Sequence, residues 1–272
     1  MAVSTNSYFS NSIIGVPQVG ADIDIYESNI TPKYAVGFGF TRADGNKYRY
    51  CQFGALSNRG LMVATDVSES GATKIDNVGA LAANISKRAG ETLNPNAVGS
   101  RYMQLVITAT SQQFAGGYLT VMTGTGAGFT YRIKGNTATS ANNPVTGNIY
   151  VDLWDKIAVA IDSNSDIAIA GCGYANLEGS TTTDAVPAGV TITNNSASSY
   201  GWITTGGITG VLQDANIGTI GAPVALSTNT TGAVMIVGSG STTGSDLVVT
   251  QVGYLVEAGS SADYSLVCLT LE

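Results

Sequence analysis

The sequence predicts an all-β protein made of antiparallel domains, sandwich-like or barrel-like, with short strands. Short apolar runs recur about every 8 to 12 residues, Gly-rich turns separate them, and several runs alternate between apolar and polar residues. Glycine contributes 34 of the 272 residues, and hydrophobic residues make up 44% of the chain. This composition is typical of a folded, turn-rich β-protein.

The first third of the chain is predicted to contain an arm and a hairpin. Residues 1–32 are polar and are interrupted by Pro17 and Pro32, which favours an extended N-terminal arm. Residues 33–100 form a first β segment. Within it, Asp44-Gly45 separates two alternating runs and predicts a hairpin, because a type I′ turn needs positive φ at both central positions. One segment is a helix candidate, because its apolar residues are spaced as on one face of a helix: Val78, Leu81, Ala82 and Ile85. Extended structure is the alternative for this segment.

A central β-meander domain is predicted over 101–178. Its expected strands are the runs MQLVITAT, YLTVMT, FTYRIKG, NIYVDL, KIAVAI and DIAIAGC. Residues 179–199 are rich in Thr and Ser and are predicted to be a linker or a long loop. This linker favours the interpretation that 101–178 is an insertion in a domain built from both ends.

A C-terminal β segment over 200–272 is expected to pack with 33–100. The runs AVMIVG and LVV lack alternation, so they are predicted to be central strands that are covered on both faces.

The absence of histidine excludes several kinds of chemistry. Ser/His/Asp and Cys/His nucleophile systems, His-ligated metals and proton shuttling near neutral pH all require that residue. The three cysteines are far apart and are interpreted as small buried residues rather than as disulfides or metal ligands: Cys51, Cys172 and Cys268. The sequence therefore predicts no metal, no cofactor and no enzyme activity. No apolar run is long enough for a membrane span, and the absence of a signal-like start favours an intracellular origin.

Three motifs suggest chemistry at first sight. Gly124–Gly128 resembles a phosphate-binding loop, but it precedes a strand and is interpreted as a turn. Asp162, Asn164 and Asp166 begin a calcium-loop pattern that then lacks its glycine and its glutamate, which favours an Asx turn. Two pairs of acids could act as the paired carboxylates of a glycoside-cleaving enzyme: Asp22 with Asp24, and Asp152 with Asp155. The favoured interpretation is that they are ordinary acidic residues near turns.

Charge is distributed unevenly along the chain. All twelve Lys and Arg residues lie at or before Lys156, where the net charge is +2, and residues 157–272 carry nine acids and no base. Five early cations are candidates for a docking face on an acidic protein surface, with an ordinary solvated strand face as the alternative: Lys33, Arg42, Lys47, Arg49 and Arg59. The charge distribution predicts that the first part of the chain faces a partner and the later part faces solvent. A pI near 4.5 argues against nucleic-acid binding.

Several segments resemble tailed-bacteriophage capsid decoration (cement) proteins. They span roughly residues 33–272: KYAVGFGFTRADGNKYRYCQFGA, AGGYLTVMTGTGAGFTYRIKGN, IYVDLWDKIAVAIDSNSDIAI, YGWITTGG and VGYLVEAGSSADYSLVCLTLE. The resemblance implies an all-β virion protein on the capsid exterior, often trimeric, that binds the major capsid protein and reinforces the shell. It implies no catalytic residues.

Three other functions stay open. The chain could be a head-fibre or tail component that contacts the host through loops such as 179–199. It could be a carbohydrate-active enzyme on a β-scaffold, or a bacterial surface adhesin. The leading expectation is a decoration protein, made in the host bacterial cytoplasm and assembled onto the virion without membrane or nucleic-acid partners.

Overall fold

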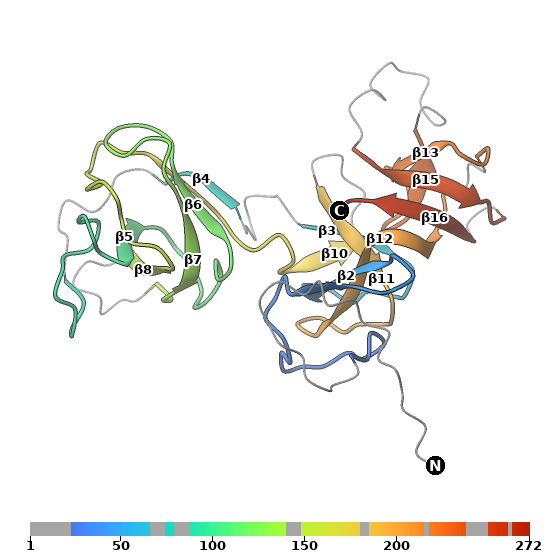
Figure 1. The fold of residues 1–272 in the computed structure, drawn as a ribbon, viewed down its shortest axis with the longest axis horizontal. Coiled ribbons are helices and arrows are strands. Elements are labelled where there is room, and N and C mark those ends of the chain that lie inside the picture. Colours follow the sequence, from blue (N-terminus) through green and yellow to red (C-terminus); the bar gives the residue numbers. More distant parts are fainter. Residues whose placement is uncertain are drawn as a thin grey trace, which may run out of the picture. The chain divides into compact units, whose positions relative to one another are not determined.

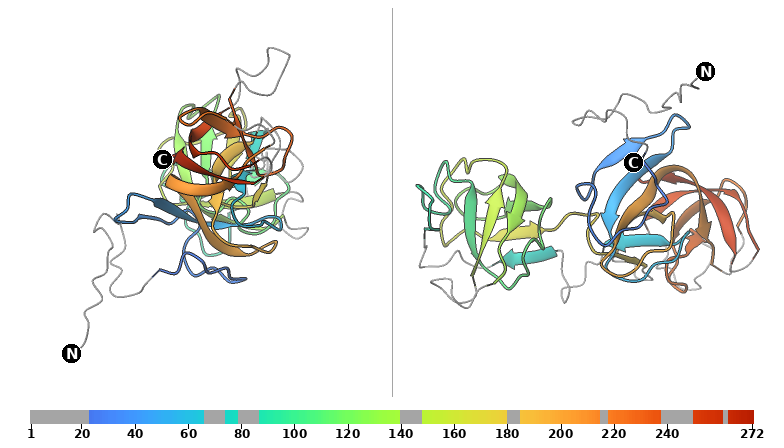
Figure 2. Two further views of the ribbon diagram at one scale, coloured as in Figure 1. Left: turned by 90° about the vertical axis from the view of Figure 1, so that its right-hand side faces the viewer. Right: turned by 90° about the horizontal axis from the view of Figure 1, so that it is seen from below.

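The protein folds into two compact units, each with its own sheet (Figures 1 and 2). The computed structural model describes residues 23–65, 74–78, 87–139, 148–179, 185–214, 218–237, 250–260 and 263–272. Unit 1 combines Met1–Val67 with Tyr174–Glu272, and unit 2 is the intervening Ser68–Gly173. The second unit thus begins well before the boundary expected at residue 101 and ends just before residue 178.

The described residues confirm the all-β fold class: they contain antiparallel sheets and no α-helix. None of these residues forms a helix that is long and apolar enough to cross a membrane.

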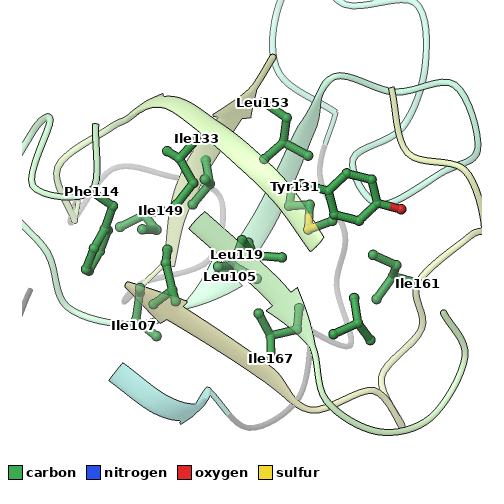
Figure 3. Close-up of a cluster of buried hydrophobic side chains, with 14 of the residues drawn as sticks. Leu105, Ile107, Phe114, Leu119, Tyr131, Ile133, Ile149, Leu153, Ile161 and Ile167 are labelled. Carbon is green, nitrogen blue, oxygen red and sulfur yellow. The ribbon is translucent and has the colours of Figure 1, made fainter. Parts of the chain in front are cut away.

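Unit 2 is built on an antiparallel sheet in the order β4-β9-β6-β7-β8-β5. Its strands are β4 (Lys74–Val78), β5 (Tyr102–Val106), β6 (Tyr118–Val121), β7 (Thr130–Asn136), β8 (Asn148–Leu153) and β9 (Ile167–Ala170). Alternate residues of β7 are buried, as the sequence predicts, and Tyr131 and Ile133 point into the core with Leu119 and Ile149 (Figure 3). The opposite face of β6 and β7 is exposed.

Unit 1 contains a larger antiparallel sheet that curls into half a barrel and follows the path β10-β3-β11-β12-β16-β15-β13-β14, with β2 also paired to β12 and β1 paired to β2. The strands are β1 (Gly39–Thr41), β2 (Lys47–Gln52), β3 (Met62–Thr65), β10 (Leu177–Gly179), β11 (Val186–Thr191), β12 (Tyr200–Leu212), β13 (Pro223–Leu226), β14 (Val234–Ile236), β15 (Gln251–Glu257) and β16 (Tyr264–Thr270). Residues from both ends of the chain therefore share one sheet.

Strand β12 connects the parts of unit 1. Its first half pairs with β2 and β11, and its second half pairs with β16. The register shifts between Thr204 and Gly206, and Gly207 has a φ of 90°. Trp202 in the first half packs in a cluster of aromatic rings from β1 and β2, whereas Val211 in the second half belongs to an aliphatic cluster. One long strand therefore serves two differently composed cores.

The predicted hairpin is confirmed, but its turn differs from the expected type I′ turn. β1 and β2 pair antiparallel from Gly39↔Arg49 to Thr41↔Lys47, which leaves a five-residue connection. Only Gly45 in this connection has positive φ, and its amide donates to the carbonyl of Arg42. The longer connection lets Asp44 keep an ordinary backbone conformation, because a single left-handed residue suffices to reverse the chain.

The structure differs from the sequence expectation at three further segments. β11 lies inside the predicted linker 179–199, where the run VPAGVT pairs with β3 and β12. The run KIAVAI is not a strand; Ile157 and Ile161 are buried, and the residues between them are exposed. Within AVMIVG, β14 lies at the end of the sheet path and not in the centre of the sheet as predicted. Its first two residues are nevertheless buried, because burial of a side chain does not require a strand neighbour on both edges.

Some expectations lie wholly or partly outside the described residues. Residues 1–22 of the expected arm and most of the helix candidate belong to this group, although Val78 of that candidate ends β4. The described end of the arm packs onto unit 1, because Ile23 and Ile25 are buried in the aromatic cluster. The LVV run, 247–249, also lies outside the described residues.

Candidate functional site

The structure uses two of the five predicted docking cations in internal ion pairs. Lys33 pairs with Glu27, and this hydrogen bond raises the pKa of the lysine ammonium group. The Nε of Arg49 lies 2.9 and 3.0 Å from the two carboxylate oxygens of Glu272, and its guanidinium group stacks over the ring of Tyr174. These two cations contribute to the cohesion of unit 1.

Arg42 and Arg59 instead line one groove of about 550 Å³, which we call the hairpin groove. Lys47 lies at the start of β2, where its side chain flanks Gly206. The hairpin groove is formed by the β1–β2 turn, the turn before β3, the end of β11, the middle of β12 and the start of β16. Its lining residues are Ile25, Tyr26, Arg42, Asp44, Asn46, Tyr48, Arg59, Gly60, Thr191, Ile192, Thr204, Ile208, Thr209, Gly210, Tyr264 and Leu266.

Hydrogen bonds of the hairpin turn fix one side of the groove. The amide of Asn46 donates to Oδ1 of Asp44 at 2.9 Å, and Oδ1 of Asn46 accepts from the amide of Ile208 at 2.9 Å. The Asn46 side chain lies against Gly207, where an added Cβ atom would collide with it. The hairpin turn is therefore anchored to β12 at its glycine bend.

A second glycine fixes the opposite side. Gly60 has a φ of 71°, and an added Cβ would lie 2.5 Å from Cε1 of Tyr264. This close approach seats the tyrosine ring against the turn before β3, and its hydroxyl group donates to the carbonyl oxygen of Arg59 at 3.2 Å. Gly60 thus positions both an aromatic ring and a cation at the rim.

The groove combines a buried floor with an amphipathic rim. Tyr48 and Thr204 are buried below, whereas Tyr26 is 66% exposed and Tyr264 is 48% exposed. The guanidinium carbon of Arg42 lies 5.3 Å from the centroid of the Tyr48 ring, which holds the cation over an aromatic face. Aromatic residues and arginine at the edge of a concave surface are typical of protein-binding sites.

The same lining contains little that could catalyse a reaction. Its one carboxylate, Asp44, accepts the turn hydrogen bond from Asn46, and no cysteine lines the groove. Glycoside cleavage needs two facing carboxylates. The arrangement is suited to binding an apolar segment that carries negative charge.

The other sequence motifs are structural in the described residues. Gly124–Gly128 forms the turn between β6 and β7, with positive φ at its three glycines. Oδ1 of Asp162 accepts from the amide of Asn164 at 2.9 Å, a hydrogen bond that lowers the pKa of this carboxyl group and confirms the Asx turn. No group of three or more potential metal ligands occurs in the part of the chain that the structure describes.

The acid pairs proposed for glycoside cleavage have other partners where they are described. Asp152 pairs with Arg88 at 2.8 Å, and Asp24 accepts from the amide of Tyr26 at 2.9 Å. Asp155 is exposed beside Trp154, and Asp22 lies outside the described residues. One acid of each pair is therefore engaged in a hydrogen bond or ion pair within the protein.

Cys51, Cys172 and Cys268 form no disulfide with one another. Cys51 and Cys172 are buried, as predicted, whereas Cys268 is only partly buried.

The apolar and aromatic residues that line the groove were not predicted from the sequence. Tyr26, Ile208, Tyr264 and Leu266 come from three distant segments that the fold brings together. One signal was present in β16, where Tyr264 and Leu266 place large apolar side chains at the outward positions of an alternating strand. Outward apolar residues on an alternating strand indicate a surface that is covered by something else.

Comparison with known proteins gives no relative for this chain. No family model, curated protein or solved structure matches it. The binding role of the hairpin groove is therefore argued from its geometry alone.

Proposed function

We propose that the protein is a non-enzymatic structural protein of a phage virion that decorates the capsid and binds the major capsid protein through the hairpin groove. The observation that carries the binding role is the convergence of Arg42 and Arg59 on an amphipathic groove in unit 1. The virion part of the proposal is supported by the resemblance of the sequence to capsid decoration proteins. The proposed location is the capsid exterior, and the proposed assembly is a homo-oligomer, with a trimer favoured.

The proposed mechanism is stabilisation by binding. A decoration protein that binds assembled capsid subunits and not separated ones shifts the equilibrium toward the assembled shell. Many copies around the shell multiply a modest contact. The capsid segment that enters the groove would place apolar side chains between Tyr26 and Tyr264 and an acidic group near the two arginines.

The two parts of the chain that were expected to divide into a docking part and a solvent-facing part are not separate in the fold. Both parts build unit 1, where β2 pairs with β12 and Arg49 pairs with Glu272. Unit 1 contains five basic and twelve acidic residues, whereas unit 2 contains seven of each. Position along the chain therefore does not separate the cations from the acids of unit 1. The proposed docking depends instead on the two arginines at the hairpin groove.

Charge reversal tests the groove directly. The double variant Arg42→Glu with Arg59→Glu should reduce the number of copies bound to purified heads that lack the protein, because it repels the acidic segment. We expect a loss of affinity of about tenfold or more. The matched control reverses two exposed lysines of unit 2, Lys87→Glu with Lys156→Glu, and changes the net charge equally.

Filling the groove gives a test that does not depend on charge. An added Cβ at Gly210 meets no atom within 4 Å, so Gly210→Trp should occupy the groove without disturbing β12. Gly173→Trp is the control, because that glycine is equally open and does not line the groove. Unchanged occupancy of heads by folded Gly210→Trp and by the double Glu variant would contradict groove-mediated docking. A particle reconstruction without this chain on the shell would contradict the decoration role itself.

A further inference from the structure

The outer face of the sheet in unit 2 is half covered and half bare. Over β5 and β8, Arg88 stacks on the rings of Tyr102 and Tyr150, with its guanidinium carbon 4.9 and 5.8 Å from their centroids. The same guanidinium group pairs with Asp152 at 2.8 Å and with Glu91 at 3.0 Å. The segment before β5 thus covers these two strands.

Over β6 and β7 the described residues provide no such cover, and aromatic and cationic side chains follow one another across the face. Tyr118 of β6 is directly opposite Arg132 of β7. Lys134 lies two residues further along β7 on the same face, and its Nζ is 5.5 Å from the centroid of the Trp154 ring. The amide of Trp154 donates to the carbonyl oxygen of Arg132 at 3.0 Å, which fixes the tryptophan beside the strand. We call these four residues the ring–cation strip.

The strip exposes rings that would be expected to be buried. Tyr118 is 55% exposed and Trp154 is 52% exposed, although both lie on or beside a well-packed sheet. No ion pair of Arg132 or Lys134 occurs within the described part of unit 2, where the acidic Asp152 is already paired with Arg88. Positions next to Tyr118 carry small or hydroxylated side chains, namely Ala170 and Thr120.

We propose that the ring–cation strip is a binding site for a carboxylated polysaccharide. Flat exposed rings offer surfaces for the apolar faces of sugar rings, and the cations between them offer partners for the carboxylates. Arg132 and Lys134 are two residues apart on one strand, so their side chains leave the sheet about 7 Å apart and can contact successive charged sugars. An open sheet face admits a polymer whose chain continues beyond the site at both ends.

The surroundings favour this ligand over nucleic acid or protein. Unit 2 has no net charge, so most charges of a phosphate backbone, which has one charge per about 1.7 Å, would lie beside the strip without a cation as partner. A protein hot spot is surrounded by contacts that exclude water. Beside the strip lie the paired hydroxyl groups of Thr120 and Thr130, 3.0 Å apart, which suit a hydroxylated ligand.

Intrinsic fluorescence provides a direct test. The chain has two tryptophans, and Trp202 is 1% exposed in the core of unit 1, so a ligand on the strip should alter the emission of Trp154 alone. Titration of the full chain with polygalacturonate should give a saturable change that weakens with salt. Dextran, which has no carboxylates, should bind at least about tenfold more weakly. Equal binding of dextran, or preferential binding of poly-dT, would overturn the proposal.

Variants separate the strip from general charge effects. Arg132→Gln with Lys134→Gln should lower the affinity for polygalacturonate about tenfold or more, and Tyr118→Ala should lower it severalfold. Lys87→Gln, which neutralises an exposed lysine of the same unit, should leave it unchanged. The variant Trp154→Ala lacks the fluorescent reporter, so its affinity is measured by electrophoresis in gels that contain the polymer. This variant should no longer be retarded by the polymer, and its mobility in gels without polymer should be unchanged. Retardation equal to that of the unaltered protein would also refute the site, and none of these variants touches the hairpin groove.

Discussion

The side chain of Glu272 collects hydrogen bonds from three separate parts of unit 1. Arg49 donates from Nε, Tyr174 from its hydroxyl group at 2.7 Å, and Thr205 from Oγ1 at 3.2 Å. Partial burial raises the pKa of Glu272, but the hydrogen bonds and the charge of Arg49 outweigh burial and lower its pKa overall. The carboxylate form is therefore the one that stabilises the folded unit.

Acid should weaken this arrangement. Because the folded-state pKa of Glu272 lies below the unfolded value, its contribution is present above the unfolded pKa of about 4.3 and is lost as pH falls through the folded pKa. Glu272→Gln should lower the unfolding free energy by up to about 1 kcal/mol at neutral pH, since the pair is partly exposed, and by less at about pH 3. Urea unfolding at both pH values measures this, with Glu257→Gln as the exposed control. An equal loss at both pH values would contradict the assignment.

At the scale of the element, β12 contains two glycines whose surroundings differ. Gly207 has positive φ and lies against the Asn46 side chain, whereas Gly210, three residues later, faces open space. The first allows β12 to bend as its pairing passes from β2 to β16. The second leaves room in the hairpin groove.

The same substitution at these two sites should have opposite effects. Gly207→Ala should lower the unfolding free energy by more than about 2 kcal/mol, because it adds left-handed strain and a collision. Gly210→Ala should be neutral or raise it by up to about 1 kcal/mol, because alanine has less freedom to lose on folding. Chemical denaturation of both variants makes the comparison. Equal losses would show that glycine at 207 is not required by the bend.

At the scale of the whole molecule, each unit has buried apolar clusters of its own. Sixteen buried apolar residues form the cluster of unit 2, and all come from one continuous segment. Figure 3 shows part of this cluster. Unit 1 builds its sheet from strands on both sides of that segment in the sequence. A unit with its own core can unfold on its own.

Calorimetry of the full chain should therefore show two unfolding transitions. Asn136 is buried in unit 2, where its Nδ2 donates to the carbonyl oxygens of Thr110 and Thr137 and its Oδ1 accepts from the amide of Phe114. Asn136→Ala should lower only one transition, by several degrees, because it leaves buried backbone groups without partners. Gly207→Ala should lower the other. A single transition that shifts with both variants would contradict independent units.

Local sequence patterns predicted the elements better than their assembly. Alternation identified β7, and Asp44-Gly45 located the first hairpin, because both signals arise between residues close in the chain. The Thr- and Ser-rich segment 179–199 resembled a loop, because the strand character of β11 within it comes from pairing with β3 and β12. In the candidate site, Arg42 and Arg59 were predicted as docking cations, but Tyr26 and Tyr264 were not, because no local pattern brings residues 238 positions apart together.

The sequence alone determined that the chain is a turn-rich, antiparallel β-protein whose absence of histidine excludes much enzyme chemistry. These properties follow from composition and from short-range periodicity. Only the tertiary structure decided which cations line a groove and which pair with acids, because an ion pair such as Arg49 with Glu272 joins residues from opposite ends of the chain. It likewise decided that the early cations and the late acids share one unit, since strand pairing depends on three-dimensional neighbours rather than on chain order.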